Sequence, residues 1–425
     1  AFESKLELRD FQEKRRLALE RDHRKLNTQQ HYFVIEEEVG KGLPLWMPNG
    51  TVIRDELEKL AKEWEFLGGY QRVATPHITK ENLYHTSGHL PYYADSMFPP
   101  MEVDGEKLYL KPMNCPHHHM IYKAVPRSYR DLPVRFAEYG TCYRYEQSGE
   151  LAGLLRVRAL TMNDAHIYCT PEQVKEEFIR VIRLHIDYYK LFGLQDFWMR
   201  LSLAEEDATK FVDDPEVWPR AEALVMEAMD EVEIPYESVR GEAAFYGPKI
   251  DFQVSNVVGR EETASTNQLD LVMAGRFGLA YKGADGQDHA PMIIHRAPLG
   301  THERFCAFLI EHYGGAFPTW LAPVQVRIIP VAPTFAEYAH QLRGELHRNF
   351  LRIEVDDSHD SFGKKIRNGA TVKIPNLLIV GSEEQSNQAV TWQRYGSKAR
   401  EAVAFAEFQS RILEENRNRA DWRNV

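Results

Sequence analysis

The chain has 425 residues, 43% of them hydrophobic and 27% charged, and a formal net charge of −11 at pH 7. A chain of this length exceeds what one hydrophobic core usually organises, so we expect two or more domains. The sequence has no run of eighteen apolar residues and no charged-then-apolar leader, which argues against membrane insertion and export. Its four cysteines fit a reducing cytoplasm better than a disulfide framework.

The first 30 residues are a charged stretch that predicts a linker helix, and the chain opens on Ala1 inside it. We therefore expect the sequence to be part of a longer protein. From residue 31 to about residue 319, strand-like segments mix with long helices. Residues 170–192 are a predicted helix, because Thr170 and Gln173 form a capping box with proline at the first helical position.

Cys115 lies in the run Lys-Pro-Met-Asn-Cys-Pro-His-His-His at residues 111–119, and His166 and His295 could join it in a metal site. Three such ligands leave one position of a zinc ion open, whereas structural zinc is normally closed by four ligands in short paired spacings. No such pair of cysteines occurs in the sequence. A single cysteine or histidine is more often packed or solvated than bound to metal, so both interpretations stay open at this point.

The two histidines have informative neighbours. Residues 161–168 alternate in polarity and predict a strand with its polar residues, His166 among them, on one face. Residues 291–300 hold a short apolar run that meets a basic, glycine-marked break just after His295. We therefore expect both histidines to project from strand ends, near anion-binding positions.

Three arginines could bind an anion. Two predicted strands joined by a loop would hold Arg144 and Arg156 near one another, with the second strand at residues 154–158. A planar guanidinium binds two phosphate oxygens at once and never loses its charge, so such a pair suits a triphosphate. Arg304 adds a third cation at the start of a predicted helix, whose first amides also favour anions. For any one arginine alone, a solvated surface position is the competing interpretation.

Two prolines around a short apolar stretch mark a domain boundary at residues 317–323. Beyond it, buried strands alternate with helices, which predicts a mostly parallel sheet with helices on its faces. The expected strands cover residues 324–331, 352–356 and 376–380, and the expected helices cover residues 335–350 and 362–368.

Taken together, these residues resemble the class II aminoacyl-tRNA synthetases. Residues 144–164 are similar to the second motif of that class, an arginine-x-glutamate, a loop and a strand. Residues 300–304 are similar to its third motif, glycine-x-x-glutamate-arginine, and residues 53–76 resemble its first, a helix followed by a strand and a proline. The runs that narrow the resemblance to the threonyl-tRNA synthetases, over nearly the whole chain, are residues 111–116, 163–166, 244–249 and 294–297.

The resemblance implies an α+β fold. A class II catalytic domain at residues 31–319, an antiparallel sheet with helices, would be followed by a C-terminal α/β anticodon-binding domain at residues 322–425 with a mostly parallel sheet. It also implies an enzyme that activates L-threonine with ATP and Mg²⁺, transfers it to the 3′ end of tRNA(Thr), and forms a homodimer through the first motif. The negative net charge does not oppose this partner, because tRNA needs only local basic surface.

The resemblance makes zinc the expected metal, bound by Cys115, His166 and His295. Threonine and valine have nearly the same shape, and a hydrophobic pocket separates such isosteres by only about a hundredfold. A zinc ion with an open position can bind the amino and hydroxyl groups of threonine together, which valine cannot match. The resemblance places in the threonine pocket Met113, Asp164, Tyr246 and Gln268.

For the nucleotide, the resemblance assigns Arg144 to the α-phosphate and the threonine carboxylate, and Arg156 to the outer phosphates. Arg304 would stack on adenine as a flat cation. Glu146 would accept a hydrogen bond from the adenine amino group, and Gln268 would also contact ATP. The family positions close to the reacting groups are occupied by His89 and Lys249.

Several positions depart from the commonest family pattern. Leu160 stands where an aromatic ring usually stacks beneath adenine, so we expect an apolar platform and a lower affinity for ATP. Met162 and Asn163 replace a frequent glutamine and aspartate, and Ala264 replaces a frequent cysteine.

Other functions fit the sequence less well. A zinc hydrolase would need His-Glu-x-x-His or a comparable base beside the metal, and the sequence has no such run. It also lacks the phosphate loop of kinases and the His-Ile-Gly-His run of class I synthetases. The serious alternative is a tRNA-binding protein without catalytic activity, which should have lost Arg144, Arg304 or a metal ligand. All of these residues are present.

Overall fold

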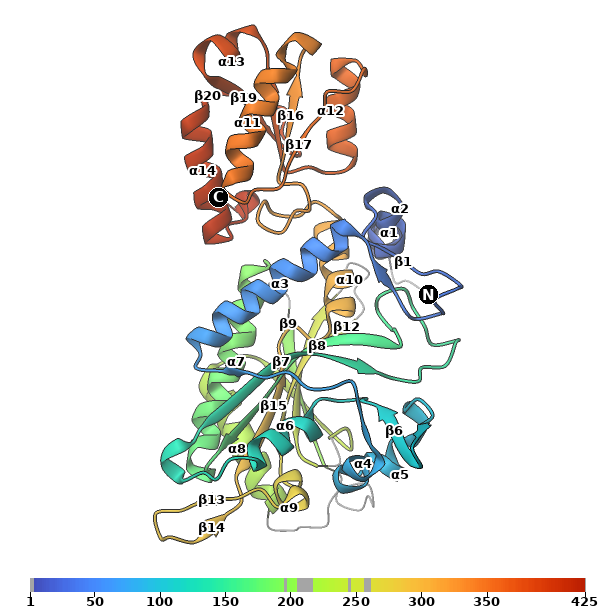
Figure 1. Ribbon diagram of the computed structural model, residues 1–425, viewed down its shortest axis with the longest axis vertical. Coiled ribbons are helices and arrows are strands. Elements are labelled where there is room, and N and C mark those ends of the chain that lie inside the picture. The colour runs from blue at the N-terminus through green and yellow to red at the C-terminus, as the bar shows by residue number, and fades with distance from the viewer. Residues whose placement is uncertain (1–3, 195–196, 205–216, 244–245, 256–260, 425) are drawn as a thin grey trace. The chain divides into compact units, whose positions relative to one another are not determined.

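The computed structural model describes residues 4–194, 197–204, 217–243, 246–255 and 261–424, which Figure 1 draws as coloured ribbons. The chain forms two compact units. The first consists of Ala1–Val34, Leu45–Leu57 and Cys306–Val425, and the second consists of Ile35–Pro44 and Glu58–Phe305. Within the described ranges, none of the helices has the length and apolar character needed to cross a membrane.

The second unit is built on an eight-stranded sheet with the order β10-β9-β11-β12-β15-β8-β7-β3. Its inner pairings are all antiparallel, and only the two outermost pairs, β10 with β9 and β3 with β7, are parallel. The expected antiparallel sheet is therefore confirmed. In sheet order the strands are Tyr236–Arg240, Phe197–Leu203, Lys249–Ser255, Glu261–Asp270, Met292–Ala297, Ala159–Cys169, Val134–Tyr143 and Gln71–Arg72.

Helices cover this sheet. Helix α7 (Val174–Leu191) contacts β8, β12 and β15, and α8 (Val217–Val232) packs against α7, as Figure 1 shows. The predicted capping box precedes α7, where the Gln173 side chain accepts a hydrogen bond from the Thr170 amide (3.0 Å). The Trp64 ring of helix α3 (Pro48–Leu67) stacks on the Tyr188 ring of α7, with centroids 4.5 Å apart. Strand β8 is consequently buried almost throughout, including the polar residues of the predicted face.

Short elements complete the second unit around α6 (Cys115–Lys123). Tyr122 of α6 stacks on Tyr168 of β8 with ring centroids 4.3 Å apart, so the helix is held against the sheet. The other short elements are α4 (Glu81–Ser87), α5 (His89–Tyr92), α9 (Met273–Phe277), the hairpin β13 (Tyr281–Lys282) with β14 (Asp288–His289), and a small sheet of β4 (Ile78–Lys80), β6 (Glu106–Leu110) and β5 (Met101–Val103).

The first unit carries a five-stranded sheet with the order β17-β16-β18-β19-β20. The three strands predicted from sequence are present and parallel, and two further strands add antiparallel pairings, so the sheet is mixed. In sheet order the strands are Ile353–Val355, Val326–Pro330, Asn376–Val380, Ala389–Arg394 and Glu401–Ala404. The helices are α11 (Ala336–Arg348), α12 (Phe362–Thr371), α13 (Ser382–Asn387) and α14 (Phe405–Asn418).

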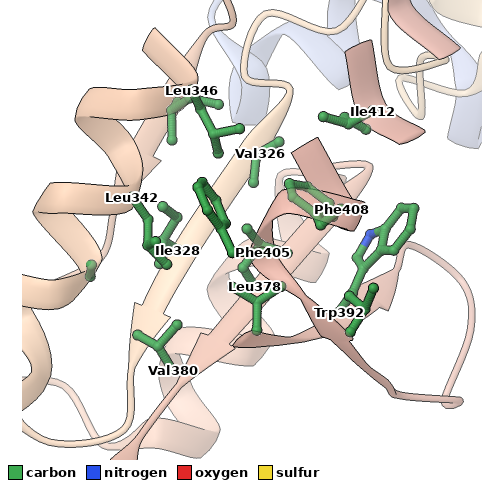
Figure 2. Packing of buried hydrophobic residues seen from close by; sticks show 14 of the residues in the cluster. Val326, Ile328, Leu342, Leu346, Leu378, Val380, Trp392, Phe405, Phe408 and Ile412 are labelled. Atoms are coloured by element: carbon green, nitrogen blue, oxygen red, sulfur yellow. The ribbon is translucent and has the colours of Figure 1, made fainter. Parts of the chain in front are cut away.

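The core of this unit lies between the sheet and its helices. Figure 2 shows Leu342 of α11 beside Ile328 of β16, Leu346 of α11 near Val326 of β16, and Phe408 of α14 beside Trp392 of β19. The Trp392 and Phe408 rings meet edge to face with centroids 4.9 Å apart, an arrangement that aromatic pairs favour. Burial of these side chains explains why the apolar runs of the C-terminal sequence form strands and helices here.

The N-terminal segment forms two helices rather than one. Helix α1 (Lys5–Arg21) ends where Asp22 accepts a hydrogen bond from the Arg24 amide (2.8 Å) and so caps α2 (His23–Gln30). Residues 1–3 of the expected linker helix lie outside the described residues. His23 bonds Glu311 (2.8 Å) of α10 (His302–Tyr313), which ties α2 to that helix.

Several described residues other than glycine have a positive φ, and Phe350 is the one with a large, exposed apolar side chain. Phe350 follows α11 in the left-handed conformation (φ 62°) with 92% of its surface exposed. The left-handed region costs a residue with a Cβ about 1–2 kcal/mol, and glycine is the usual residue just past a helix end. The exposed ring makes no compensating contribution to the core.

We therefore expect Phe350→Gly to stabilise the protein by about 0.5–1 kcal/mol, which raises the melting temperature of a unit of this size by about 2–4 °C. Calorimetry of the full chain measures the shift. Phe350→Ala is the control, because it removes the same ring but keeps the Cβ, and it should leave the transition nearly unchanged. Equal stabilisation by both variants would contradict the strain argument.

Candidate functional site

A row of side chains crosses the central sheet on one face. His166 of β8 lies directly opposite His295 of β15, His295 lies opposite Gln268 of β12, and Gln268 lies opposite Lys249 of β11. Residues paired directly across strands point to the same face, so the four side chains form one line. The expectation that the histidines project from strand ends is wrong, because both lie inside their strands.

Cys115 completes the predicted trio from the first residue of α6. The ligand atoms of Cys115, His166 and His295 lie within 4.8 Å of one another. Nε2 of His166 faces Nδ1 of His295 at 2.8 Å. The structure thus brings together, from one helix and two strands, the three residues that the sequence suggested as metal ligands.

The electrostatics of this trio suit a cation. Burial, followed by the charges of Asp164 and Asp270, raises the pKa of the Cys115 thiol well above its usual range. Burial, followed by its histidine neighbours, lowers the pKa of His166 well below its usual value, so this ring is neutral. Neutral imidazoles are ready metal ligands, and a thiolate in this position needs a positive charge beside it.

Sequence reasoning missed the residues behind the trio. Oδ2 of Asp270 lies 2.9 Å from Nε2 of His295, and the other carboxylate oxygen accepts the amides of Val272 and Met273 at the start of α9. His118 of α6 lies 2.7 Å from His166. The histidine run of α6 was visible in the sequence, but nothing local indicated which of its rings meets β8. Metal-binding histidines usually have such outer partners.

Asp270, His119 and His295 form a second set of ligand atoms within 4.8 Å of one another. Nδ1 of His119 lies 2.9 Å from the Tyr168 hydroxyl. Because both oxygens of Asp270 already accept hydrogen bonds from the protein, its carboxylate orients His295 rather than offering a free ligand.

The predicted threonine-pocket residues surround the trio. The Tyr246 ring stacks on His295 with centroids 5.4 Å apart, and its hydroxyl donates to Gln268. Asp164 accepts a hydrogen bond from Asn114 (3.1 Å), and burial raises the pKa of its carboxyl although His118 and Asn114 oppose the shift. Half-buried Met113 directly precedes Asn114. Ala244 and Phe245 of the run before Tyr246 lie outside the described residues.

The predicted arginines sit at one edge of the sheet. The amide of Arg144, just past β7, donates to the carbonyl of Arg158 (2.9 Å), so Arg158 and not Arg156 lies across from it. The expected strand at residues 154–158 is absent, because β8 begins only at Ala159. The loop that follows Arg144 therefore continues up to Ala159, further along the chain than its glycine and serine indicated.

Arg156 and Glu146 bind each other. The Arg156 guanidinium lies 2.7 Å from Glu146 and 3.3 Å from Glu150, and it is 45% exposed. Arg304, in the first turn of α10, donates from Nε to the carbonyl of Leu155 (3.3 Å) and is exposed. One loop therefore connects these cations. The expected helix start at Arg304 is present as α10.

Leu160 packs in a small apolar cluster with Cys142, Val157 and half-buried Met162. The expected apolar platform is thus a buried one, 6% exposed. Asn163, another of the departures, donates to Glu65 of α3 (3.0 Å), which also pairs with the buried Arg296 (2.9 Å). The two unusual residues therefore serve packing and a buried polar network in this chain.

His89 and Lys249 complete the predicted set. Nδ1 of His89, the first residue of α5, lies 2.7 Å from Oγ of Ser87. Burial, followed by the positive charges of Arg144 and Arg276, lowers the pKa of His89 to about 4. The influence of Arg144 shows that these two residues share one electrostatic environment. Lys249 forms an ion pair with Asp251 (2.9 Å) on its own strand.

Two stretches of the chain match known protein families. Residues 100–313 match the family described as the class II core domain of tRNA synthetases (G, H, P, S and T), and residues 325–415 match the anticodon-binding domain family. The two matches cover the sheet with the candidate site and the C-terminal mixed sheet.

Similar proteins include threonine–tRNA ligases. That of Deinococcus deserti is 52% identical over 422 residues, which are 99% of this chain and 65% of the relative, and that of Bacillus velezensis is 49% identical over 417 residues, 98% and 65%. The chain thus spans slightly less than two thirds of these curated relatives. A solved structure titled as the RNA-binding domain of threonyl-tRNA synthetase from Cryptosporidium parvum has a TM-score of 0.88 and 33% identity, and the match covers 93% of this chain and 98% of that one.

The buried position of His89 gives a pH prediction. Its pKa of about 4 lies below the ordinary value of 6.5, so its neutral form contributes stability that is complete above pH 6.5 and is lost as the pH falls through 4. The difference corresponds to about 3 kcal/mol. Titration of the ring by NMR should give a midpoint near 4, and Arg276→Ala should raise it. A midpoint near 6.5 in the parent protein would contradict this.

Proposed function

Because the chain belongs to the class II tRNA synthetases, in the threonyl-tRNA synthetase family, we propose that it activates L-threonine with ATP and transfers it to the 3′ end of tRNA(Thr). The observation that carries this proposal is the meeting of Cys115, His166 and His295 beside Asp164 and Tyr246 on a class II sheet. This combination would offer a metal ion and an acceptor carboxylate to one bound amino acid.

In the proposed reaction the protein would position ATP and threonine and stabilise charge, and none of its side chains would form a covalent bond with them. Phosphoryl-type transfers are catalysed mainly by such means. Arg144 would bind the α-phosphate and the threonine carboxylate, and Arg304 would stack on adenine. Arg156 would meet the outer phosphates once Glu146 turns to the adenine amino group. The present Arg156–Glu146 pair is partly exposed, and such pairs contribute only about 0–1 kcal/mol, so this exchange costs little.

The other predicted residues would act close to the reacting groups. Neutral His89 beside Arg144 can accept a proton or a hydrogen bond at neutral pH, and Lys249 can offer a positive charge. Gln268, held by Tyr246, would line both the threonine and the ATP positions.

The trio fits a zinc ion. A neutral nitrogen of His166 faces His295, and the Cys115 thiolate would lie among carboxylates, so a divalent cation relieves an otherwise unfavourable set of donors. Bound zinc would supply an open position for the amino and hydroxyl groups of threonine, which valine cannot fill. Asp164 would accept a hydrogen bond from the bound amino acid, and Met113 would border the same pocket.

The same proposal implies binding partners, an oligomeric state and a cellular compartment. ATP would arrive with Mg²⁺, and the unit that contains the anticodon-binding match would contact tRNA(Thr). We propose that the protein forms a homodimer through the end of α3. Phe66 and Leu67 are 80% and 81% exposed there, and exposed apolar surface of this kind can mark a contact with another protein chain. All four cysteines are free, as a thiol ligand requires, which suits a reducing cytoplasm.

The first prediction of this proposal concerns the metal. The purified chain should bind about one zinc ion, and Cys115→Ser should lose both the metal and threonine-dependent ATP–pyrophosphate exchange. Elemental analysis and the exchange assay across the twenty amino acids measure the two properties. Cys142→Ser is the matched control, because Cys142 is buried near the site but lies outside the trio. Full threonine activation by metal-free protein would rule the zinc role out.

The second prediction concerns the arginines. Arg144→Ala or Arg304→Ala should slow adenylate formation at least about a hundredfold, on the order of 3 kcal/mol of transition-state stabilisation. Melting temperatures should change little, since the hydrogen bonds that join Arg144 to the Pro112 carbonyl and Arg304 to the Leu155 carbonyl are long. Exposed Arg348 is a suitable control position. Activity within a few-fold of the parent would remove these residues from the catalytic machinery.

A further inference from the structure

A line of hydrogen bonds lies behind the ligand candidate His166. Nδ1 of His166 lies 2.7 Å from Nδ1 of His118, and Nε2 of His118 lies 3.1 Å from Oε2 of Glu138 on β7. All three side chains are buried. The line therefore connects Nδ1 of His166, the nitrogen that does not face His295, to a carboxylate on the neighbouring strand.

Glu138 is held firmly at the far end of this line. It accepts hydrogen bonds from the amide (2.8 Å) and hydroxyl (2.9 Å) of Thr75, and Nζ of the fully buried Lys111 lies 3.7 Å away. Lys111 also donates to the Thr75 hydroxyl (2.6 Å). Every group around the carboxylate is a donor or a cation, so Glu138 is ionised and can only accept hydrogen bonds.

These partners decide where the protons lie. Because Glu138 can only accept, Nε2 of His118 carries the proton that bonds it, and Nδ1 of His118 is free to offer a lone pair to His166. Nδ1 of His166 must then donate to that lone pair, which leaves the lone pair of His166 on Nε2. Nε2 is the atom that faces His295 at 2.8 Å.

Asp270 has a similar effect on the other histidine, His295, because it can fix which ring nitrogen carries the proton. Its carboxylate lies 2.9 Å from Nε2 of His295 and can accept a proton there, so that Nδ1 of His295 can offer its lone pair. The two nitrogens that face each other at 2.8 Å, one from His166 and one from His295, could then both bind a cation together with the Cys115 sulfur. The two histidines reach this state differently, since His295 meets its carboxylate directly and His166 meets Glu138 only through a second ring.

We propose that His118 is a positioning residue which, through Glu138, fixes the tautomer and orientation of His166 so that Nε2 is presented to the metal. This inference rests on the zinc site of the proposed function. The buried Lys111–Glu138 pair supports it, because buried ion pairs add little net stability and are better explained by a positional role. Outer partners of metal-bound histidines commonly contribute ten- to hundredfold in metal affinity.

His117 offers a matched control on the same helix. It is as buried as its neighbours, but among the described residues neither of its ring nitrogens has a hydrogen-bond partner. A variant at His117 therefore changes the packing of α6 without touching the line to His166.

The test measures zinc affinity of the metal-depleted full chain by competition with a chromophoric chelator. His118→Phe removes both hydrogen bonds, and His118→Gln keeps an amide for Glu138 but offers no acceptor to His166. Both should weaken zinc binding about ten- to hundredfold. His118→Asn places an oxygen where Nδ1 stood and should stay within about threefold of the parent, as should His117→Phe. Cobalt substitution, read from the thiolate charge-transfer band, checks that Cys115 still binds.

The outcomes separate the two proposals. Unchanged zinc affinity in His118→Phe and His118→Gln would overturn the positioning role, and so would equal weakening by His117→Phe, which would indicate mere repacking of α6. If His118→Phe fails to fold, the polar His118→Gln carries the comparison. A parent protein that binds no zinc would instead overturn the zinc site of the proposed function itself.

Discussion

His166 and His295 lie directly opposite one another on β8 and β15, and a shift of one residue in either strand would turn one ring to the α7 face of the sheet. The register is strongly specified because both faces of these strands are buried. The same row continues into Gln268 and Lys249. A single set of strand pairings thus positions two metal-ligand candidates and two further residues of the predicted site at once, and Cys115 needs only the docking of α6 to join them.

The second feature is that buried charged side chains are paired with opposite charges or with hydrogen-bond donors. Asp270 accepts from His295 and from two backbone amides, and Arg296 pairs with Glu65 at 2.9 Å with both side chains fully buried. Removing one partner of such a pair leaves an uncompensated charge at a cost of about 3–5 kcal/mol. Asp270 beside His295, and the Glu65–Arg296 pair on the opposite face of the sheet, are therefore held in fixed positions. Preorganised groups of this kind lose little free energy when a ligand binds.

The anion side of the site is built differently. Arg156 and Arg304 are exposed, and their present partners are a surface carboxylate and a backbone carbonyl. Exposed ion pairs are weak and are exchanged easily, so this edge can reorganise around phosphates while the buried trio stays fixed. This division fits the proposed function, in which the buried trio would select one small amino acid and the exposed arginines would admit and release a large, highly charged nucleotide.

Local sequence determined much of this molecule, because periodicity and capping act within a few residues. The alternation at residues 161–168 and the capping box at Thr170 predicted β8 and α7, and the motif resemblance named the trio. Tertiary structure decided the rest. No local signal showed that Glu138 would meet His118, that Arg158 would replace Arg156 across from Arg144, or that two antiparallel strands would complete the C-terminal sheet. Such contacts join segments distant in the chain, and only packing and strand register choose among the partners that the sequence allows.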